Sequence, residues 1–238
     1  GTAGYDALGF ANQATQDALG DAVGAFSFSR PEDLATNPAN GRQVVLASTG
    51  RDPEFPADKW GTTYIIDFNT TDLANVTAKV NILYDGDDAG AGQFSGPDFG
   101  LRSPDNLDWS PNGLIYIQED RSFSGFGQAS GQEASLWEAN PATGQLTRIG
   151  QVDRTAVPSG QTDAAPTDLG NWETSGIVDI SSLLGVTDEV VFLVTSQGHS
   201  LTGGPITANI LGEGGQLLVM SGPRKSVTTA PAQVKGIG

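Results

Sequence analysis

The chain has 238 residues and no cysteine, and its 28 acidic and 12 basic side chains give a formal net charge of −16. This charge argues against binding to nucleic acids, and the lack of thiols excludes disulfides, zinc–thiolate sites and cysteine nucleophiles. No apolar run approaches the roughly 20 residues that a membrane-spanning helix needs, so we expect no membrane span. The acidity is compatible with hard cations, which prefer carboxylate oxygen, although it also serves solubility alone.

The chain begins with a segment, residues 1–24, that is rich in alanine and glutamine from about Tyr5 onward. This composition predicts a short helix ahead of the first strand. After it, 32 glycines and 13 prolines are spread between short apolar runs. Short runs separated by turn residues are typical of an all-β fold.

Three stretches of the chain can be laid over one another as repeats. Each has an opening segment, a continuous apolar strand and an alternating strand, and the first two end in a polar outer strand. These segments are 30–34, 43–48, 61–68 and 78–84 in the first repeat, 103–107, 113–118, 134–138 and 145–152 in the second, and 171–175, 189–195 and 214–220 in the third. The third repeat has no clear fourth strand.

The repeats predict one all-β domain over residues 1–238, a β-propeller of about three four-stranded blades, with a short N-terminal helix. We expect the blades at 25–85, 100–153 and 170–222, followed by a C-terminal tail at 223–238. A β-sandwich would also show alternating strands, but it would not explain the matched opening segments.

Three blades do not close a ring, because propellers carry about 4–8. We therefore expect the chain to be a fragment of a larger propeller or to be completed by another polypeptide. Exposed blade edges predict a partner chain or self-association.

Three acids fall at matching places in the opening segments: Glu32, Asp105 and Glu173. In a propeller the innermost strands line the central channel, so these side chains would converge on the axis. Their mutual repulsion would favour a bound cation, and calcium suits them because it takes 6–8 oxygen ligands in flexible geometry. The alternative is that these carboxylates only cap turns at the blade entrances.

Four further polar residues lie close to these acids in the pattern. Arg30 is two residues from Glu32, so both point to the same side of an extended strand, and its planar fork matches phosphate. Asn106 follows Asp105, and Glu119 ends a strand where it can be a direct or indirect metal ligand. His199 follows the corresponding strand of the third repeat. Each of these residues also has a purely structural interpretation.

These residues lie in four motifs that resemble the PhoX-type alkaline phosphatase family of bacteria. The motifs are Phe28-Ser29-Arg30-Pro31-Glu32-Asp33, Ser103-Pro104-Asp105-Asn106-Leu107 with 113–120, Trp172-Glu173-Thr174-Ser175-Gly176, and Ser196-Gln197-Gly198-His199. The resemblance implies a six-bladed propeller that is secreted to the periplasm or beyond. It also implies hydrolysis of phosphate esters with calcium and iron.

The resemblance implies roles for individual residues. Glu32 looks like a metal ligand and Arg30 like a phosphate contact. Asp105 and Asn106 match the family's Asp-Asn pair, and Glu173 matches its Glu-x-Thr-Gly, here with serine in place of threonine.

Two further residues and two departures qualify the resemblance. Glu119 sits where members often carry another acid, and His199 sits near the family's Gln-His, but with Gly198 inserted. The family places a cysteine on its iron pair, and this chain has none. The part of the family that holds this cysteine also has no counterpart here. The chain therefore resembles the C-terminal half of a member, and iron binding does not carry over to it.

The sequence thus predicts a metal-dependent phosphoester hydrolase, with Arg30, Asn106 and His199 as catalytic residues and phosphate esters as substrates. The predicted calcium ligands are Glu32, Asp105, Glu173 and Glu119. Two alternatives stay open: a calcium-stabilised, non-catalytic propeller that binds or scaffolds molecules outside the cell, and a lactonase-type propeller hydrolase.

Overall fold

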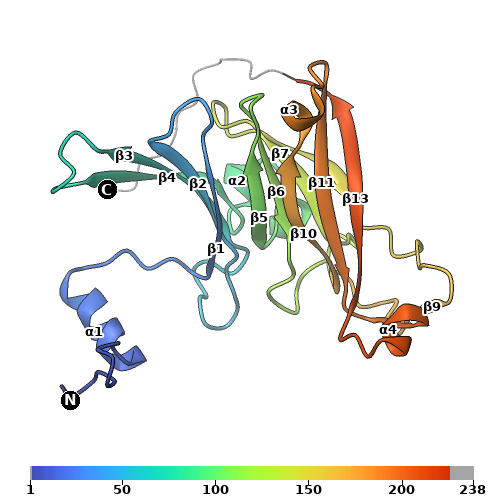
Figure 1. Cartoon of the computed structure of the whole chain (residues 1–238), viewed down its shortest axis with the longest axis horizontal. Helices are drawn as coiled ribbons and strands as arrows, with labels where there is room; N and C mark the ends of the chain where they lie inside the picture. The colour runs from blue at the N-terminus through green and yellow to red at the C-terminus, as the bar shows by residue number, and fades with distance from the viewer. Residues whose placement is uncertain (1, 226–238) are drawn as a thin grey trace.

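The computed structural model describes residues 2–225. Three antiparallel sheets follow one another along the chain and stand side by side (Figure 1). The first sheet has the order β1-β2-β3-β4, the second β5-β6-β7-β8 and the third β10-β11-β13. Their strands are β1 (Pro31–Thr36), β2 (Gln43–Ser48), β3 (Thr62–Asn69), β4 (Thr77–Asp85), β5 (Pro104–Trp109), β6 (Ile115–Glu119), β7 (Ser135–Ala139), β8 (Leu146–Gln151), β10 (Trp172–Asp179), β11 (Glu189–Gly198) and β13 (Gly214–Pro223).

The remaining elements are short. Helix α1 (Gln13–Ala22) lies in the segment where the sequence predicts a helix, and the Asn12 side chain caps it by accepting a hydrogen bond from the Thr15 N–H. The others are α2 (Ala89–Gly92), the 3-10 turn η1 (Pro97–Phe99), α3 (Ser181–Leu184), α4 (Gly204–Ala208) and the two-stranded pair β9 (Gln161–Asp163) with β12 (Leu201–Gly203). Within residues 2–225, no helix is long and apolar enough to cross a membrane.

The expectation of an all-β fold is confirmed. The third sheet has three strands among the described residues, where the sequence shows no clear fourth. A closed ring is not seen within residues 2–225, so the propeller and its blade boundaries stay predictions. Most of the expected C-terminal tail, residues 226–238, lies outside the described part of the chain.

The first strand of each sheet carries the same one-residue bulge. Between the two residue pairs that flank the bulge, the first strand advances by three residues and its neighbour by only two. The pairs that flank the bulge are Pro31↔Ser48 and Leu34↔Leu46, Pro104↔Glu119 and Leu107↔Ile117, and Thr174↔Ser196 and Ile177↔Val194. A bulge of this kind releases two side chains from the regular alternation and turns them out of the ladder.

The bulges correct one detail of the repeat comparison. Counted from them, Glu32, Asp105 and Ser175 are equivalent. Glu173 lies two residues earlier, level with Arg30. The offset arises because sequence comparison matched residue types, whereas the ladder register fixes the true equivalence.

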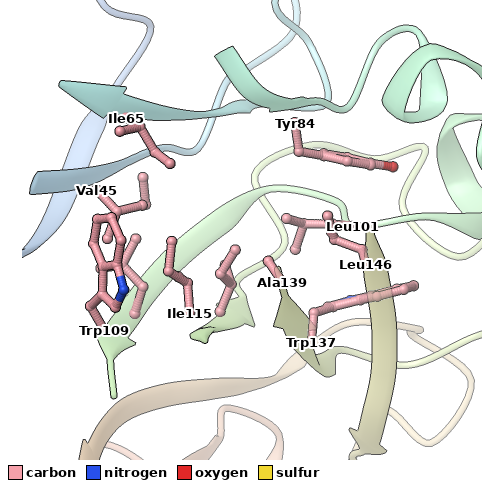
Figure 2. Close-up of a cluster of buried hydrophobic side chains, with 12 residues drawn as sticks. Val45, Ile65, Tyr84, Leu101, Trp109, Ile115, Trp137, Ala139 and Leu146 are labelled. Carbon is pink, nitrogen blue, oxygen red and sulfur yellow. The ribbon is translucent and has the colours of Figure 1, made fainter. Parts of the chain in front are cut away.

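Apolar side chains fill the space between consecutive sheets. Between the first and second sheets, Val45 and Ile65 face Trp109 and Ile115 in a core that continues to Trp137 (Figure 2). A second core lies between the second and third sheets and contains Leu114, Tyr116, Val190, Phe192 and Val194. These two cores fix the three sheets relative to one another.

The second sheet also holds a buried ion pair. Arg102 and Glu119 are both fully buried, and their closest N–O distance is 2.7 Å. Arg102 also approaches Asp98 at 3.3 Å and stacks over the Phe126 ring, with its guanidinium carbon 3.8 Å from the ring centre. Because the Arg102 guanidinium has no access to water, its buried positive charge must be compensated by these partners.

We expect Arg102→Met to lower the free energy of unfolding by about 3–5 kcal/mol, because it leaves the Glu119 carboxylate buried without its counter-ion. Urea denaturation measures the change. The matched control is Arg51→Met, since Arg51 pairs with Glu54 in a half-exposed ion pair worth about 1 kcal/mol or less. Equal losses in the two variants would contradict this role for Arg102.

Candidate metal and phosphate site

Four carboxylates lie near the starts of β1, β5 and β10, and each is within electrostatic range of at least one other. We call Glu32, Asp105, Asp120 and Glu173 the acid cluster. Glu32 and Asp105 come from bulges, Glu173 from the start of β10, and Asp120 from the residue after β6. Three of the four were predicted as metal ligands from the sequence, and the structure places them close enough to affect one another's pKa.

Arg30 lies at the edge of the acid cluster. Its Nη2 donates to Glu32 Oε1 at 3.1 Å, and about a third of each side chain is exposed. Its backbone φ is 62°, a left-handed conformation that is uncommon outside glycine. The positive charge acts beyond Glu32, since it lowers the pKa of both Asp105 and Asp120.

The surroundings of Asp105 disfavour ionisation of its carboxyl group. Burial raises its pKa to about 6, and the charges of Asp120 and Glu32 add to the effect. A hydrogen bond from Thr49 Oγ1 at 3.3 Å and the charge of Arg30 act in the opposite direction. The carboxylate therefore lies in a region of net negative potential.

Asp120 and Glu173 form a hydrogen-bonded pair of carboxyl groups. Burial raises the pKa of Asp120 to about 8, and the hydrogen bond with Glu173 raises it further toward the protonated form. Burial also raises the pKa of Glu173, which is stabilised as the acceptor of that bond. At neutral pH the pair shares one proton, because two adjacent carboxylates repel each other.

The sequence pattern favours Glu119 over its neighbour Asp120 as a site residue, whereas the structure places Asp120 in the acid cluster. The usable signal is the bulge register. The Asp120 N–H donates to Ser103 O just as the Thr49 N–H donates to Arg30 O. Asp120 and Thr49 are thus equivalent, and both side chains approach Asp105. Without the ladder this equivalence is not visible.

Glu119 does not join the acid cluster. Besides Arg102, its carboxylate accepts hydrogen bonds from the Ser135 N–H and from Trp137 Nε1, each at 2.9 Å. The residue is fully buried inside the second sheet. The expectation that Glu119 binds metal is therefore corrected: its oxygens are already occupied by structural donors.

His199 lies between two carboxylates. Its Nε2 is 3.4 Å from Glu173 Oε2, and its Nδ1 is 2.9 Å from Glu213 Oε1. Glu213 was not predicted as a site residue, because it lies in a glycine-rich loop and gives no motif signal. The imidazole thus links the acid cluster to the loop that precedes β13.

Asn106 has a structural contact. Its side-chain oxygen accepts a hydrogen bond from the Gly176 N–H at 2.9 Å, which joins the bulge of β5 to that of β10. The neighbouring repeat shows a similar link, because Asp33 accepts from the Leu107 N–H at 3.0 Å. Asn106 therefore positions two bulges against each other, whatever further role it has.

The donor chemistry of the acid cluster suits a hard cation, since every donor is a carboxylate oxygen. Within residues 2–225, however, no three Asp, Glu or His side chains are arranged as a set that could hold a metal ion. Two hollows, of about 370 and 550 Å³, lie in the described part of the chain, and the acid cluster lines neither of them. The described residues thus bring carboxylates together but do not form a complete cation site.

We expect the stability of the protein in a chelator to fall as the pH rises from about 4 to 8. In this window native Asp120, with its pKa of about 8, keeps a proton that the unfolded chain releases near its ordinary pKa of 3.8. Asp120→Asn should flatten this fall. Urea unfolding at pH 5, 7 and 9 measures it, with Glu54→Gln as an exposed control. A wild-type slope retained in Asp120→Asn would contradict the shared proton.

Comparison with known proteins identifies relatives of the chain. A family model described as alkaline phosphatase PhoX matches residues 5–168, which include Arg30, Glu32, Asp105 and Asp120 but not Glu173. A solved structure of Pseudomonas fluorescens PhoX in complex with vanadate, a transition state analogue, is 20% identical, with a TM-score of 0.49. The match covers 78% of this chain and 33% of that one, so the chain spans about a third of its length. No curated protein matches. Since the family model covers more than half of the sequence, the chain belongs to the PhoX alkaline phosphatase family.

Proposed function

We propose that this chain forms part of a metal-dependent phosphoester hydrolase, and that the acid cluster and Arg30 belong to its active site. The observation that carries the proposal is the family match, which spans three of the four acids and Arg30. The geometry supports it, because residues far apart in the sequence lie within electrostatic range of one another near the first strands of consecutive sheets.

Arg30 is the candidate phosphate contact. One of its nitrogens donates to Glu32, and the side chain stays partly exposed. A guanidinium presents five N–H donors in a planar fork, so further donors remain for a phosphate oxygen. The Glu32 contact fixes the direction of the fork. In this position Arg30 would stabilise the negative charge on the equatorial oxygens of the phosphoryl group while that group is transferred.

We propose calcium as the cation, with Asp105, Asp120 and Glu173 as ligands beside Glu32. The support is the oxygen-only donor set and the raised pKa values of these acids, which a nearby positive charge would lower. When bound, the cation would neutralise the phosphoryl oxygens. The described residues alone give an incomplete set, so the proposal concerns only their contribution to the site. We do not extend it to iron, since the family's cysteine is missing from this sequence.

His199 is the candidate for moving a proton in this site. It contacts Glu173 through one nitrogen and Glu213 through the other, which fixes the ring between two acceptors. Through Glu173 it is connected to the shared proton of Asp120. We therefore assign His199 to proton handling or to positioning of Glu173, and Asn106 to positioning of the bulges.

Two broader features belong to the same proposal. The sheets are proposed to be blades of a propeller, supported by the repeated four-strand order and the repeated bulge. The protein is proposed to act in the periplasm or outside the cell, supported by the resemblance to secreted phosphatases. Fractionation of cells that express the protein tests this location, since the protein should then be found in the periplasmic or extracellular fraction.

A non-catalytic, calcium-stabilised binding protein is the second candidate. One observation favours it: the acid cluster lines neither of the two hollows, so neither of them is a substrate pocket over these acids. The two candidates differ in turnover and not in cation binding. Hydrolysis of p-nitrophenyl phosphate separates them, and parallel assays with lactones test the lactonase alternative.

We expect Arg30→Ala to lower kcat/KM for p-nitrophenyl phosphate by about 10²–10³-fold, because a positioned charge at the transferred phosphoryl group is lost. Arg30→Lys should recover part of the activity, since it restores charge without the fork. Arg51→Ala, which removes an exposed arginine elsewhere, is the control. An unchanged kcat/KM in Arg30→Ala would remove Arg30 from the active site.

We expect calcium to raise the thermal unfolding midpoint more at pH 9 than at pH 6. Asp105 and Asp120, with pKa values of about 6 and 8, must lose their protons before they can bind it. Saturation at 100 times the dissociation constant corresponds to about 2.7 kcal/mol of added stability. Asp105→Asn should abolish most of the shift, whereas Asp72→Asn, at an exposed turn, should keep it. A shift independent of pH and of Asp105 would place the cation elsewhere.

A further inference from the structure

The hydrogen-bonded pair of Asp120 and Glu173 lies between two sets of contacts that join the end of β6 to the start of β10. On one side, Thr174 Oγ1 accepts a hydrogen bond from the Glu119 N–H at 3.1 Å. On the other side, Arg121 contacts the turn that leads into β10. Asp120 directly follows Glu119 in the chain. Glu173 directly precedes Thr174, so the two acids are held between these two sets of contacts.

Arg121 binds three residues of the turn 168–171. Its Nη1 donates to the Leu169 backbone oxygen at 2.9 Å and also to the Asp168 carboxylate. Its Nη2 donates to Asp168 Oδ2 at 3.2 Å and to Asn171 Oδ1 at 3.5 Å. The planar fork of the guanidinium therefore spans the whole turn, with an arrangement of donors that a lysine does not offer.

Close packing holds the same turn against the loop that follows β6. The Gly170 N–H donates to Glu133 Oε2 at 2.6 Å. A Cβ on Gly170 would lie 2.5 Å from Phe126 Cδ1 and 3.2 Å from Arg121 Cδ, and the φ of Gly170 is 75°. Only glycine allows the backbone to approach this closely in that conformation. The position of the turn is therefore fixed by packing as well as by the arginine.

Arg121 provides geometry to the two acids, because its charge is already paired. When Asp120 and Glu173 are both ionised, as cation binding requires, they repel each other and the surrounding chain must hold them together. Arg121 is paired with Asp168, and its hydrogen bond lowers the pKa of Asp168. The side chains of this ion pair are 26% and 45% exposed, so the pair adds little to the free energy of unfolding.

We propose that Arg121 is a positioning residue, which holds the turn 168–171 and thereby keeps the Glu173 carboxyl group against Asp120. This inference rests on the proposed function, since it assigns a role within the same site. The sign of the effect on cation binding separates positioning from charge. Removal of a positive charge near a cation site would by itself strengthen cation binding, whereas loss of positioning weakens it.

The first test is calcium binding to the full chain, measured by calorimetric titration. We expect Arg121→Met to weaken calcium binding about tenfold or more, as for other residues that orient metal ligands. It should add little in the Asp120→Asn background, where the pair is already lost. Arg51→Met is the matched control, because Arg51 also forms a partly exposed ion pair, and it should leave the affinity unchanged. Urea unfolding in chelator should differ little between the two arginine variants.

The second test needs no cation, so it separates failure of this inference from failure of the proposed function. In chelator at pH 7, the change Asp120→Asn should shift the NMR signal of the Glu173 carboxyl carbon, because the two side chains are in contact. In the Arg121→Met background, the same change should shift this signal by about half as much or less.

Equal shifts of the Glu173 signal in the two backgrounds would overturn the positioning role, whether or not the wild type binds calcium. A calcium affinity that rises or stays the same in Arg121→Met would also overturn it. If the wild type binds no calcium but Arg121→Met still reduces the shift of the Glu173 signal, the positioning role is supported and the proposed calcium contribution is contradicted.

Discussion

The one-residue bulge on the first strand of each sheet is the constraint on which the site depends. A regular strand would alternate its side chains between the two packed faces, and the carboxylates would have to enter an apolar core. The bulge instead releases two residues from the ladder in each sheet, so Glu32 and Asp105 turn out of the alternation. Asn106 then connects one bulge to the next through the Gly176 N–H, which holds neighbouring sheets in a fixed relation.

The acidic side chains of this protein have two kinds of role, and the burial of each side chain and its hydrogen-bond partners distinguish them. Glu119 is completely buried, and its oxygens are occupied by Arg102, the Ser135 N–H and Trp137, so it is a structural acid. Asp120, the next residue, forms no ion pair with an arginine within residues 2–225 and instead shares a proton with Glu173. An acid whose charge is satisfied within the protein stabilises the fold. An acid left in a field of like charge is available to a cation.

The sequence predicted the repeated all-β organisation because glycine-rich turns and apolar runs recur along the chain. It also placed Arg30, Glu32, Asp105 and Glu173 in one region, since short motifs mark the starts of the strands. It failed at Glu119 and Asp120, where a shift of one residue moves a side chain to the opposite face of the strand. It also equated Glu173 with Asp105, because a bulge register is set by backbone pairing that residue types do not report. Glu213 could not be found, since a single acid in a glycine-rich loop carries no pattern.

We propose above all that Asp105, Asp120 and Glu173 form one electrostatically coupled group that contributes to a cation site, which the described residues do not complete by themselves. Carboxyl-detected NMR titration of Asp120, with chelator and with saturating calcium, tests it most directly. We expect an Asp120 midpoint near 8 in chelator, as its pKa of about 8 indicates. Calcium should lower this midpoint by more than about one unit and should also shift the signal of Glu173. A midpoint near the ordinary value of 3.8 in both conditions would show that these acids are independent, and it would contradict the account.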